Sequence, residues 1–205
     1  LSGDRPVVGL QSPALTGEHA RYPSLRALAA HYADLILQMQ PDGPHHLLGW
    51  STGGILAQEI ACQLQARHAR VGVVCLLDAY PADAWRDRAP AEAHDVWRAI
   101  LHIAGQDPDV LAADGPLTRE RVIGFLRAQK HPLGDLTDAQ LHGIFEAVAA
   151  SNTLVKSHPH QRYDGELLYF RAALDHVGEN LHPDMWAPWA ESLAVHDVPS
   201  LHAHI

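Results

Sequence analysis

One serine stands in a setting that could make it a nucleophile. The segment Gly49-Trp50-Ser51-Thr52-Gly53 fits the pattern Gly-x-Ser-x-Gly, with an apolar run at 46–50 before the serine and an amphipathic stretch at 53–67 after it. A strand, a turn and a helix in this order are typical of a nucleophile elbow, which exposes the serine hydroxyl. The turn brings strand and helix close together, so we expect the positions on either side of the serine to require small residues, and Gly49 and Gly53 meet this need. The backbone N–H of Thr52 is expected to donate to the oxyanion of a substrate carbonyl.

A serine hydroxyl becomes a good nucleophile only when a base takes its proton and an acid orients that base. Two acids are candidates: Asp78, which ends a very apolar run, and Asp175, which follows the later run at 166–171. Three imidazoles compete for the role of base. His202 and His204 lie after the last strand-like run, whereas His196 lies within it and is expected to be a buried structural residue. The residues themselves leave both choices open.

Other kinds of chemistry find little support. The chain has 205 residues, 15 Lys+Arg and 24 Asp+Glu, for a net charge of −9. This acidic balance disfavours a nucleic-acid partner, which would need a basic surface. The 16 histidines lack the spacing of metal ligands, so no metal site is expected. Cys62 and Cys75 are expected to be reduced core thiols.

No apolar run approaches the ~20 residues needed to cross a bilayer, and the first ten residues lack the pattern of a signal peptide. We therefore expect a cytoplasmic chain with no membrane partner.

The candidate residues depend on alternating strands and helices for their positions. Apolar runs predict strands at 5–11, 46–50, 71–77, 166–171 and 193–196, and helical periodicity predicts helices at 25–40, with Ser24 as N-cap, and at 53–67. Such alternation favours an α/β fold with a mostly parallel sheet and helices on both faces.

From about residue 82 to 157 the pattern becomes purely helical, with the best candidates at 93–103, 118–129 and 137–152. The α/β pattern resumes afterwards, so we expect one domain over 1–205 that carries a helical insertion. The insertion is a candidate lid. Its apolar residues are candidates to line a substrate chamber, although residues of this kind more often pack between the helices: Trp97, Ile100, Phe125, Leu126, Ile144 and Phe145.

With these residues in place, the sequence resembles the thioesterase domains of nonribosomal peptide synthetases, which have the α/β-hydrolase fold. The segments that carry the resemblance are VVGLQSP at 7–13, HHLLGWSTGGILAQEIACQLQAR at 45–67, VCLLDAYP at 74–81 and MWAPWAESL at 185–193. The resemblance implies Asp78 as the acid and His202 as the base. It also implies a peptidyl or acyl substrate that is held on the phosphopantetheine arm of a carrier domain, possible use in siderophore biosynthesis, and no further cofactor.

The resemblance further implies strands before the first apolar run, with a loop that supplies a second oxyanion donor, and a helix after His202. We therefore expect a partial domain, truncated at both ends, in which a lost oxyanion donor costs a factor of ~10²–10³ in rate. Two alternatives stay open: a stand-alone editing thioesterase or esterase, and a noncatalytic module that binds acyl or peptide chains.

Overall fold

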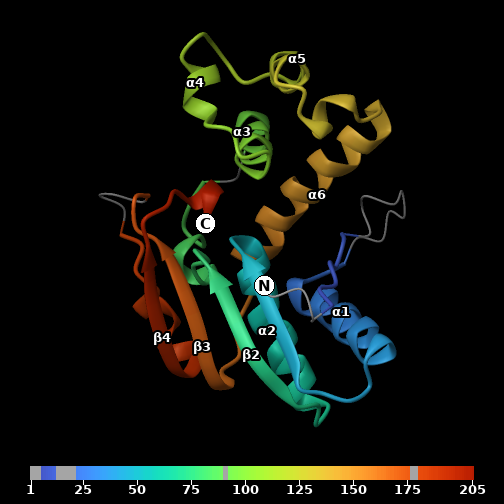
Figure 1. Ribbon diagram of the computed structural model, residues 1–205, viewed down its shortest axis with the longest axis vertical. Coiled ribbons are helices and arrows are strands. Elements are labelled where there is room, and N and C mark those ends of the chain that lie inside the picture. Colours follow the sequence, from blue (N-terminus) through green and yellow to red (C-terminus); the bar gives the residue numbers. More distant parts are fainter. Residues whose placement is uncertain (1–5, 13–21, 90–91, 176–179) are drawn as a thin grey trace.

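Four parallel strands form the centre of the protein, seen in a computed structural model that describes residues 6–12, 22–89, 92–175 and 180–205. The strands lie in the order β1-β2-β3-β4 and pair in parallel throughout (Figure 1). Their bounds are β1, His45–Trp50; β2, Val71–Leu77; β3, Tyr163–Ala172; and β4, Ala190–Val198. The four corresponding strand predictions are confirmed, although β3 and β4 extend beyond the apolar runs that predicted them.

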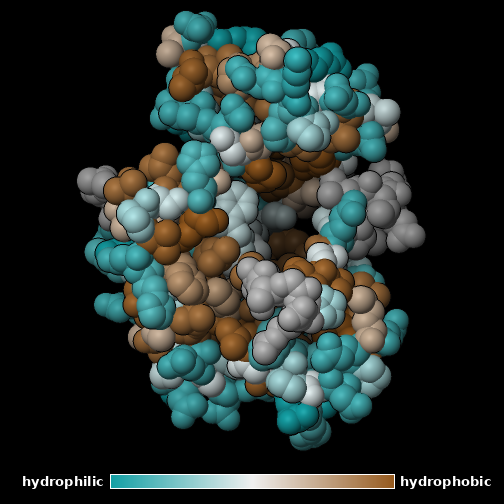
Figure 2. Space-filling model, viewed as in Figure 1, coloured by the Kyte–Doolittle hydropathy of each residue, from teal (hydrophilic) through white to brown (hydrophobic). Residues whose placement is uncertain are grey.

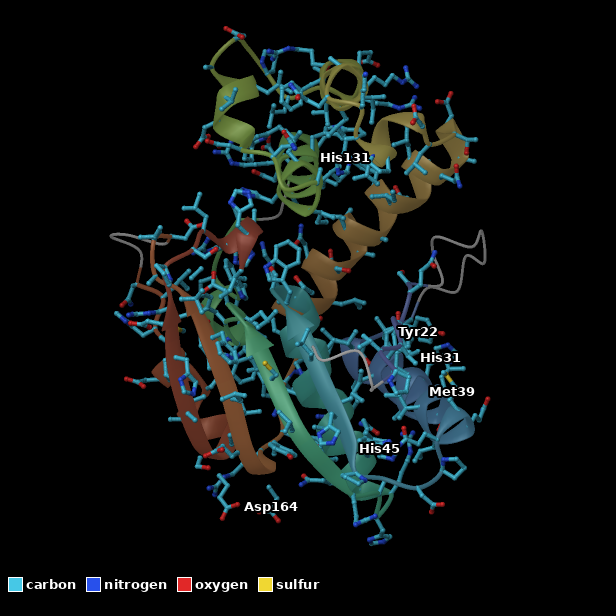
Figure 3. All side chains as sticks on the ribbon, viewed as in Figure 1. Tyr22, His31, Met39, His45, His131 and Asp164 are labelled. Carbon is cyan, nitrogen blue, oxygen red and sulfur yellow. The ribbon has the colours of Figure 1, made fainter. Side chains whose placement is uncertain are left out.

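Helix α2 (Thr52–Ala66) packs against the sheet, and helix α1 (Leu25–Met39) packs against α2. Helix α1 begins where the sequence predicts, because the Ser24 hydroxyl accepts a hydrogen bond from the N–H of Ala27 at 3.1 Å. Helix α2 connects β1 to β2 as the crossover that parallel neighbours require. His45 and Asp164, near the starts of β1 and β3, both lie at the end of the sheet away from the insertion, so the carboxyl ends of the strands point towards it (Figure 3).

The helical insertion lies between β2 and β3, as predicted. Its helices are α3 (Ala93–Ile103), α4 (Pro108–Ala112), α5 (Arg119–Ala128) and α6 (Asp138–Lys156). The two N-caps Thr118 and Thr137 set the starts of α5 and α6. Helix α4 and the 3₁₀ helix Pro183–Trp189 escape the sequence analysis because short helices carry too few turns to establish a period.

The buried apolar residues form two separate clusters. The larger one joins α1 and α2 to one face of the sheet, through side chains such as Ile55, Leu64, Leu76 and Leu167. The smaller one lies wholly within the insertion. Helix α6 connects them, since Leu141 belongs to the small cluster and Val155 to the large one. The insertion therefore has its own hydrophobic core above the carboxyl ends of the strands.

The sheet differs from the prediction of helices on both faces. In the described part of the chain α2 covers one face of the sheet, and α1 packs beside α2. Buried and exposed residues alternate along β1. Leu48 and Val73 on the other face are 60% and 44% exposed, and hydrophobic atoms are visible there in Figure 2. Strands that alternate with helices favour a parallel sheet with helical crossovers on both faces, and this is why the sequence predicts two covered faces.

The prediction of a strand at 5–11 is also wrong for residues 6–11, which the structure describes. Arg5 and the predicted turn residue Pro13 lie outside the described residues. Residues 6–12 form no strand, and Val7 and Val8 are 73% and 57% exposed. A strand needs a hydrogen-bonded neighbour, and this segment pairs with no described strand. The Tyr32 hydroxyl donates a hydrogen bond to the Gln11 carbonyl at 3.2 Å and so holds this segment against α1.

Both cysteines, Cys62 and Cys75, are buried free thiols, as expected, and burial is the main cause that raises the pKa of Cys62 to about 12. None of the helices in the described ranges is long and apolar enough to span a bilayer.

Candidate active site

Ser51 occupies a sharp turn between the end of β1 and the start of α2. Its φ of 53° and ψ of −127° are unusual for a residue with a side chain. The Ser51 N–H donates to the carbonyl of Leu77 at 3.0 Å, which ties the turn to the end of β2. Its side chain makes no capping hydrogen bond to α2. The local geometry, a strained turn between a strand and a helix, is the one that the prediction of a nucleophile elbow requires.

The glycines of this turn have unequal roles. A Cβ on Gly49 would lie 2.1 Å from the carbonyl oxygen of Gly53, so this position requires glycine. A Cβ on Gly53 would meet nothing within 4 Å, which corrects the expectation that Gly53 must be small. The steric demand falls on Gly54 instead, where a Cβ would lie 2.3 Å from the Cβ of Ala79. The pattern Gly-x-Ser-x-Gly does not include this third glycine.

Thr52 is the first residue of α2, where a backbone N–H has no acceptor within the helix. It lines the same pocket as Ser51. The positive end of the helix dipole lies at this point and favours negative charge nearby. The position suits the oxyanion donor that the sequence analysis expects.

Asp78 follows β2 directly and is 1% exposed. Its Oδ2 lies 2.6 Å from Nδ1 of His202, and its Oδ1 accepts from the Tyr80 hydroxyl and the Ala172 N–H, each at 3.2 Å. A buried carboxylate costs free energy unless hydrogen-bond donors surround it. Here three donors do so, and one of them is the imidazole of His202.

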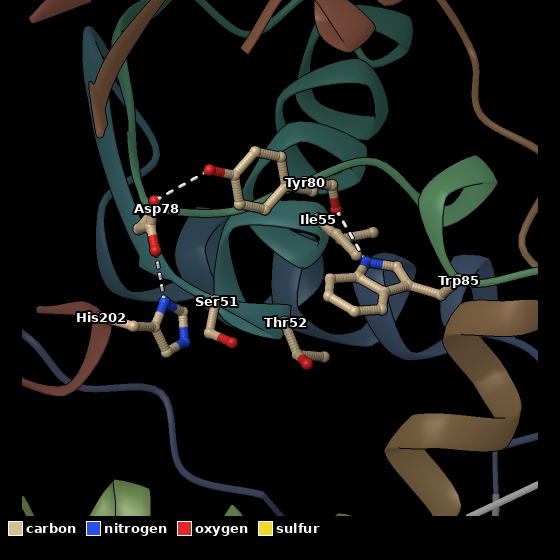
Figure 4. Close-up of a pocket in the computed structure, with 7 residues that line it drawn as sticks. All are labelled: Ser51, Thr52, Ile55, Asp78, Tyr80, Trp85 and His202. Atoms are coloured by element: carbon tan, nitrogen blue, oxygen red, sulfur yellow. Dashed lines mark hydrogen bonds and ion pairs between the residues drawn. The ribbon is translucent and has the colours of Figure 1, made fainter. Parts of the chain in front are cut away.

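His202 begins a 3₁₀ turn after β4, and its side chain is 17% exposed. With Nδ1 donating to Asp78, the other ring nitrogen, Nε2, is the one left to act as a base. The ring and the Ser51 side chain lie next to one another in Figure 4. The structure thus brings together Ser51, Asp78 and His202 from three strand ends.

The rival residues lie elsewhere or make different contacts. Asp175 accepts a hydrogen bond from the backbone N–H of His202 at 2.9 Å. His196 lies on β4 with its ring stacked on Phe170 at 5.3 Å, and it is exposed, so the expectation of a buried His196 is wrong. Nε2 of His204 lies 3.4 Å from the carbonyl oxygen of Gly105 at the end of α3.

The pocket around these residues has a cavity volume of about 70 Å³. Ligand pockets that enclose a whole molecule usually measure about 300–1,000 Å³, so this one suits a reacting group and its nearest atoms. Beyond the residues named above, Ile55, Tyr80 and Trp85 complete its wall (Figure 4).

Tyr80 is a site residue that the sequence analysis missed. It lies two residues after Asp78, and burial is the main cause that raises the pKa of its phenol to about 12. The hydroxyl therefore stays protonated and can donate to Asp78. The available signal was the sequence Asp-x-Tyr at the end of an apolar strand, because a buried tyrosine so placed needs a nearby acceptor.

The six apolar residues proposed to line a chamber in the insertion instead belong to its own core. Trp97, Ile100 and Leu126 are 7%, 2% and 0% exposed, and the other three pack against them. The histidines are also dispersed: in the described part of the chain no group of three or more His, Cys, Asp or Glu side chains could hold a metal ion.

Comparison with known proteins gives a consistent result. Residues 1–205 match the family described as Thioesterase domain. The chain is 32% identical over 191 residues to a dimodular nonribosomal peptide synthase of Bacillus subtilis (strain 168), covering 92% of this chain and 8% of that protein. It is 31% identical over 202 residues to enterobactin synthase component F of Escherichia coli (strain K12), covering 97% of this chain and 14% of that protein. The chain thus spans a small part of the length of these relatives.

Among solved structures, the four-domain nonribosomal peptide synthetase AB3403 in its holo form, bound to AMP and glycine, matches with a TM-score of 0.74 and 22% identity. The match covers 95% of this chain and 15% of that one.

Proposed function

The chain belongs to the thioesterase domain family, and from this premise we propose that it releases an acyl or peptidyl chain from a carrier domain through an ester on Ser51. The observation that carries the proposal is the 2.6 Å contact between His202 Nδ1 and Asp78 Oδ2 beside a serine on a strained elbow. An oriented imidazole next to a serine hydroxyl is the arrangement that activates a serine nucleophile.

In the first half of the reaction the Oγ of Ser51 attacks the thioester carbonyl, and Nε2 of His202 takes the hydroxyl proton. The Thr52 N–H stabilises the negative charge that develops on the carbonyl oxygen. As the carbon–sulfur bond breaks, His202 gives the proton to the departing sulfur of the phosphopantetheine arm. Asp78 keeps the imidazole in the required tautomer and stabilises its charged form.

In the second half His202 takes a proton from water, or from a hydroxyl or amine of the acyl chain itself, and returns it to Ser51 as the ester breaks. Water produces a free acid, and an internal nucleophile produces a macrocycle. No resident cofactor is needed, because the phosphopantetheine arm arrives with the substrate. The insertion over the carboxyl ends of the strands is the element that could limit access of water.

The carrier domain is the proposed partner and the cytoplasm the proposed location. A siderophore peptide is a candidate product because one of the relatives is named for enterobactin synthesis.

The test is intact-protein mass spectrometry of the chain mixed with an acylated carrier domain. We expect an acyl adduct that maps to Ser51 and is absent in Ser51→Ala. Asp78→Asn should slow adduct formation by about 10³–10⁴-fold, because the amide favours the wrong imidazole tautomer. Asp197→Asn, in an exposed pair with Arg171, is the matched control and should leave the rate unchanged.

An enzyme that also turns over free acyl thioesters at the same rate would be a stand-alone thioesterase. If no adduct forms and carrier-bound acyl groups persist as long as in buffer, the proposal fails and a binding module becomes the better description.

A further inference from the structure

The backbone of His202 is held on both sides by side chains from other parts of the chain. The indole Nε1–H of Trp50 donates to the His202 carbonyl at 2.8 Å, and Oδ2 of Asp175 accepts from the His202 N–H at 2.9 Å. Together with the ring contact to Asp78, this makes three separate hydrogen bonds to one residue.

This support matters because of where His202 lies. It follows β4 at one edge of the sheet, whereas Trp50 ends β1 at the opposite edge. Within residues 6–12, 22–89, 92–175 and 180–205, backbone pairing with the segment after β3 continues as far as Ser200, whose carbonyl accepts from the Leu174 N–H at 3.1 Å. His202 lies beyond this pairing, and in the described part of the chain side chains from other elements bind its backbone.

Trp50 also contacts the imidazole itself. The centroids of the Trp50 and His202 rings lie 5.0 Å apart at an interplanar angle of 32°. Trp50 directly precedes Ser51 in the chain, so one residue links the backbone of the nucleophile to that of the base. A displacement of either would change the distance between the Ser51 Oγ and the His202 Nε2.

Asp175 contributes from the turn after β3. Its carboxylate accepts from the backbone N–H of His202, whereas the carboxylate of Asp78 binds the ring. The two candidate acids therefore contact different parts of His202: Asp175 binds its backbone N–H, and Asp78 binds its ring nitrogen Nδ1.

We infer that Trp50 and Asp175 are positioning residues that hold His202 in line with Ser51, an inference that rests on the proposed function. Proton transfer needs the two groups within about 2.6–3.2 Å, and a displacement of about 1 Å can cost about 10²-fold in rate. Neither residue needs to exchange a proton. A carboxylate is not essential at position 175 either, since an acceptor oxygen suffices there.

The test uses a fluorophosphonate probe, which reports on the nucleophile without requiring the natural acyl group. The Ser51 Oγ forms a bond to phosphorus, the phosphorus–fluorine bond breaks, fluoride leaves, and the hydroxyl proton passes to His202. Labelling rates are measured by intact mass on the full chain. Trp50→Phe keeps an aromatic ring but removes the N–H, and Asp175→Ala removes the acceptor.

We expect each of these two variants to label about 10- to 100-fold more slowly than wild type. Asp175→Asn keeps an acceptor oxygen and should recover most of the rate. Trp189→Phe is the matched control, because the indole of Trp189 donates to Asp83 away from the pocket. It loses the same kind of hydrogen bond and should label at the wild-type rate.

A spectroscopic readout separates positioning from a general loss of stability. The His202 Nδ1 proton, shared with Asp78 over 2.6 Å, should resonate far downfield in the NMR spectrum of the wild type. Trp50→Phe and Asp175→Ala should weaken or shift this resonance at temperatures where the protein is fully folded. Asp175→Asn and Trp189→Phe should retain it.

The outcomes are distinguishable. An unlabelled wild type would refute the proposed function itself. A labelled wild type with Trp50→Phe and Asp175→Ala both within about twofold of it would overturn this inference and leave the function standing. Equal slowing by Asp175→Asn and Asp175→Ala would show that Asp175 acts through its charge, which also overturns its assigned role.

If Trp50→Phe does not fold, hydrogen exchange of the Trp50 indole proton in the wild type decides the matter. A protected proton supports the bond to His202, and exchange as fast as that of a free indole refutes it.

Discussion

His160 is a buried imidazole near the point where the helical insertion joins the sheet, and it should make the stability of the fold sensitive to acid. His160 is 8% exposed and connects the segment after α6 to two other parts of the chain. Its Nε2 accepts from the Ala82 N–H at 2.9 Å, and its Nδ1 lies 3.2 Å from the amide oxygen of Gln58. This pair of partners requires the neutral ring. Burial is the main cause that lowers the pKa of His160 from 6.5 to about 3, with smaller effects of His158 and Arg86.

The sign of the effect follows from proton linkage. As the pH falls from 7 to 5, the unfolded chain takes up a proton on this imidazole and the folded chain does not. Stability is therefore present in full above about pH 6.5 and is lost progressively as the pH falls towards about 3. With pKa values of 6.5 and about 3, the loss between pH 7 and pH 5 is about 2 kcal/mol from His160 alone.

The assay is urea unfolding at pH 7 and pH 5 for the wild type and His160→Gln, whose amide oxygen can still accept from Ala82. We expect the wild type to lose about 2 kcal/mol more than the variant between the two pH values. His142→Gln, at an exposed position on α6, is the matched control and should resemble the wild type. Equal losses in wild type and His160→Gln would refute the reasoning, as would an NMR titration of His160 with a midpoint near its unfolded value.

Three further predictions concern the elements that support the site. Gly54→Ala should lower the free energy of unfolding in urea by about 1–3 kcal/mol, because its Cβ would lie 2.3 Å from that of Ala79. Gly53→Ala meets nothing within 4 Å and should leave this free energy unchanged or raise it by up to about 1 kcal/mol. Equal effects of the two substitutions would contradict this prediction. Leu126→Ala in the insertion core, 0% exposed, should cost about 2–5 kcal/mol and increase hydrogen exchange in α3 and α5 before the sheet. Uniform loss of protection would argue against a separate core. Ser24→Ala should lower the free energy of unfolding in urea by about 0.5–2 kcal/mol, because α1 loses the 3.1 Å hydrogen bond from the Ala27 N–H to the Ser24 hydroxyl. If Ser24→Asp, which can also cap the helix, fails to retain the wild-type stability, capping is excluded as the cause.

Much of the architecture is readable from local patterns. Strands β1 and β2 and helices α1, α2 and α3 lie within a residue of their predicted bounds, because a short apolar run marks a buried strand and a 3.6-residue period repeats over the several turns of these helices. The elbow at Ser51 is local too, since five consecutive residues and their immediate flanks specify it. The helical insertion is recognisable because its segments lack apolar strand runs.

Contacts between distant segments are not readable in this way. The residues alone leave both Asp78 and Asp175 as candidates for the acid, and their different contacts with His202 appear only when the carboxyl ends of β2, β3 and β4 come together. The sheet face that no described helix covers and the segment 6–12, which pairs with no described strand, likewise depend on neighbours in space, because an apolar run does not specify what will cover it. His202 and Asp78 lie 124 positions apart, and no local period encodes a contact over that separation. The strand and helix patterns specify which elements form, and packing specifies which side chains meet.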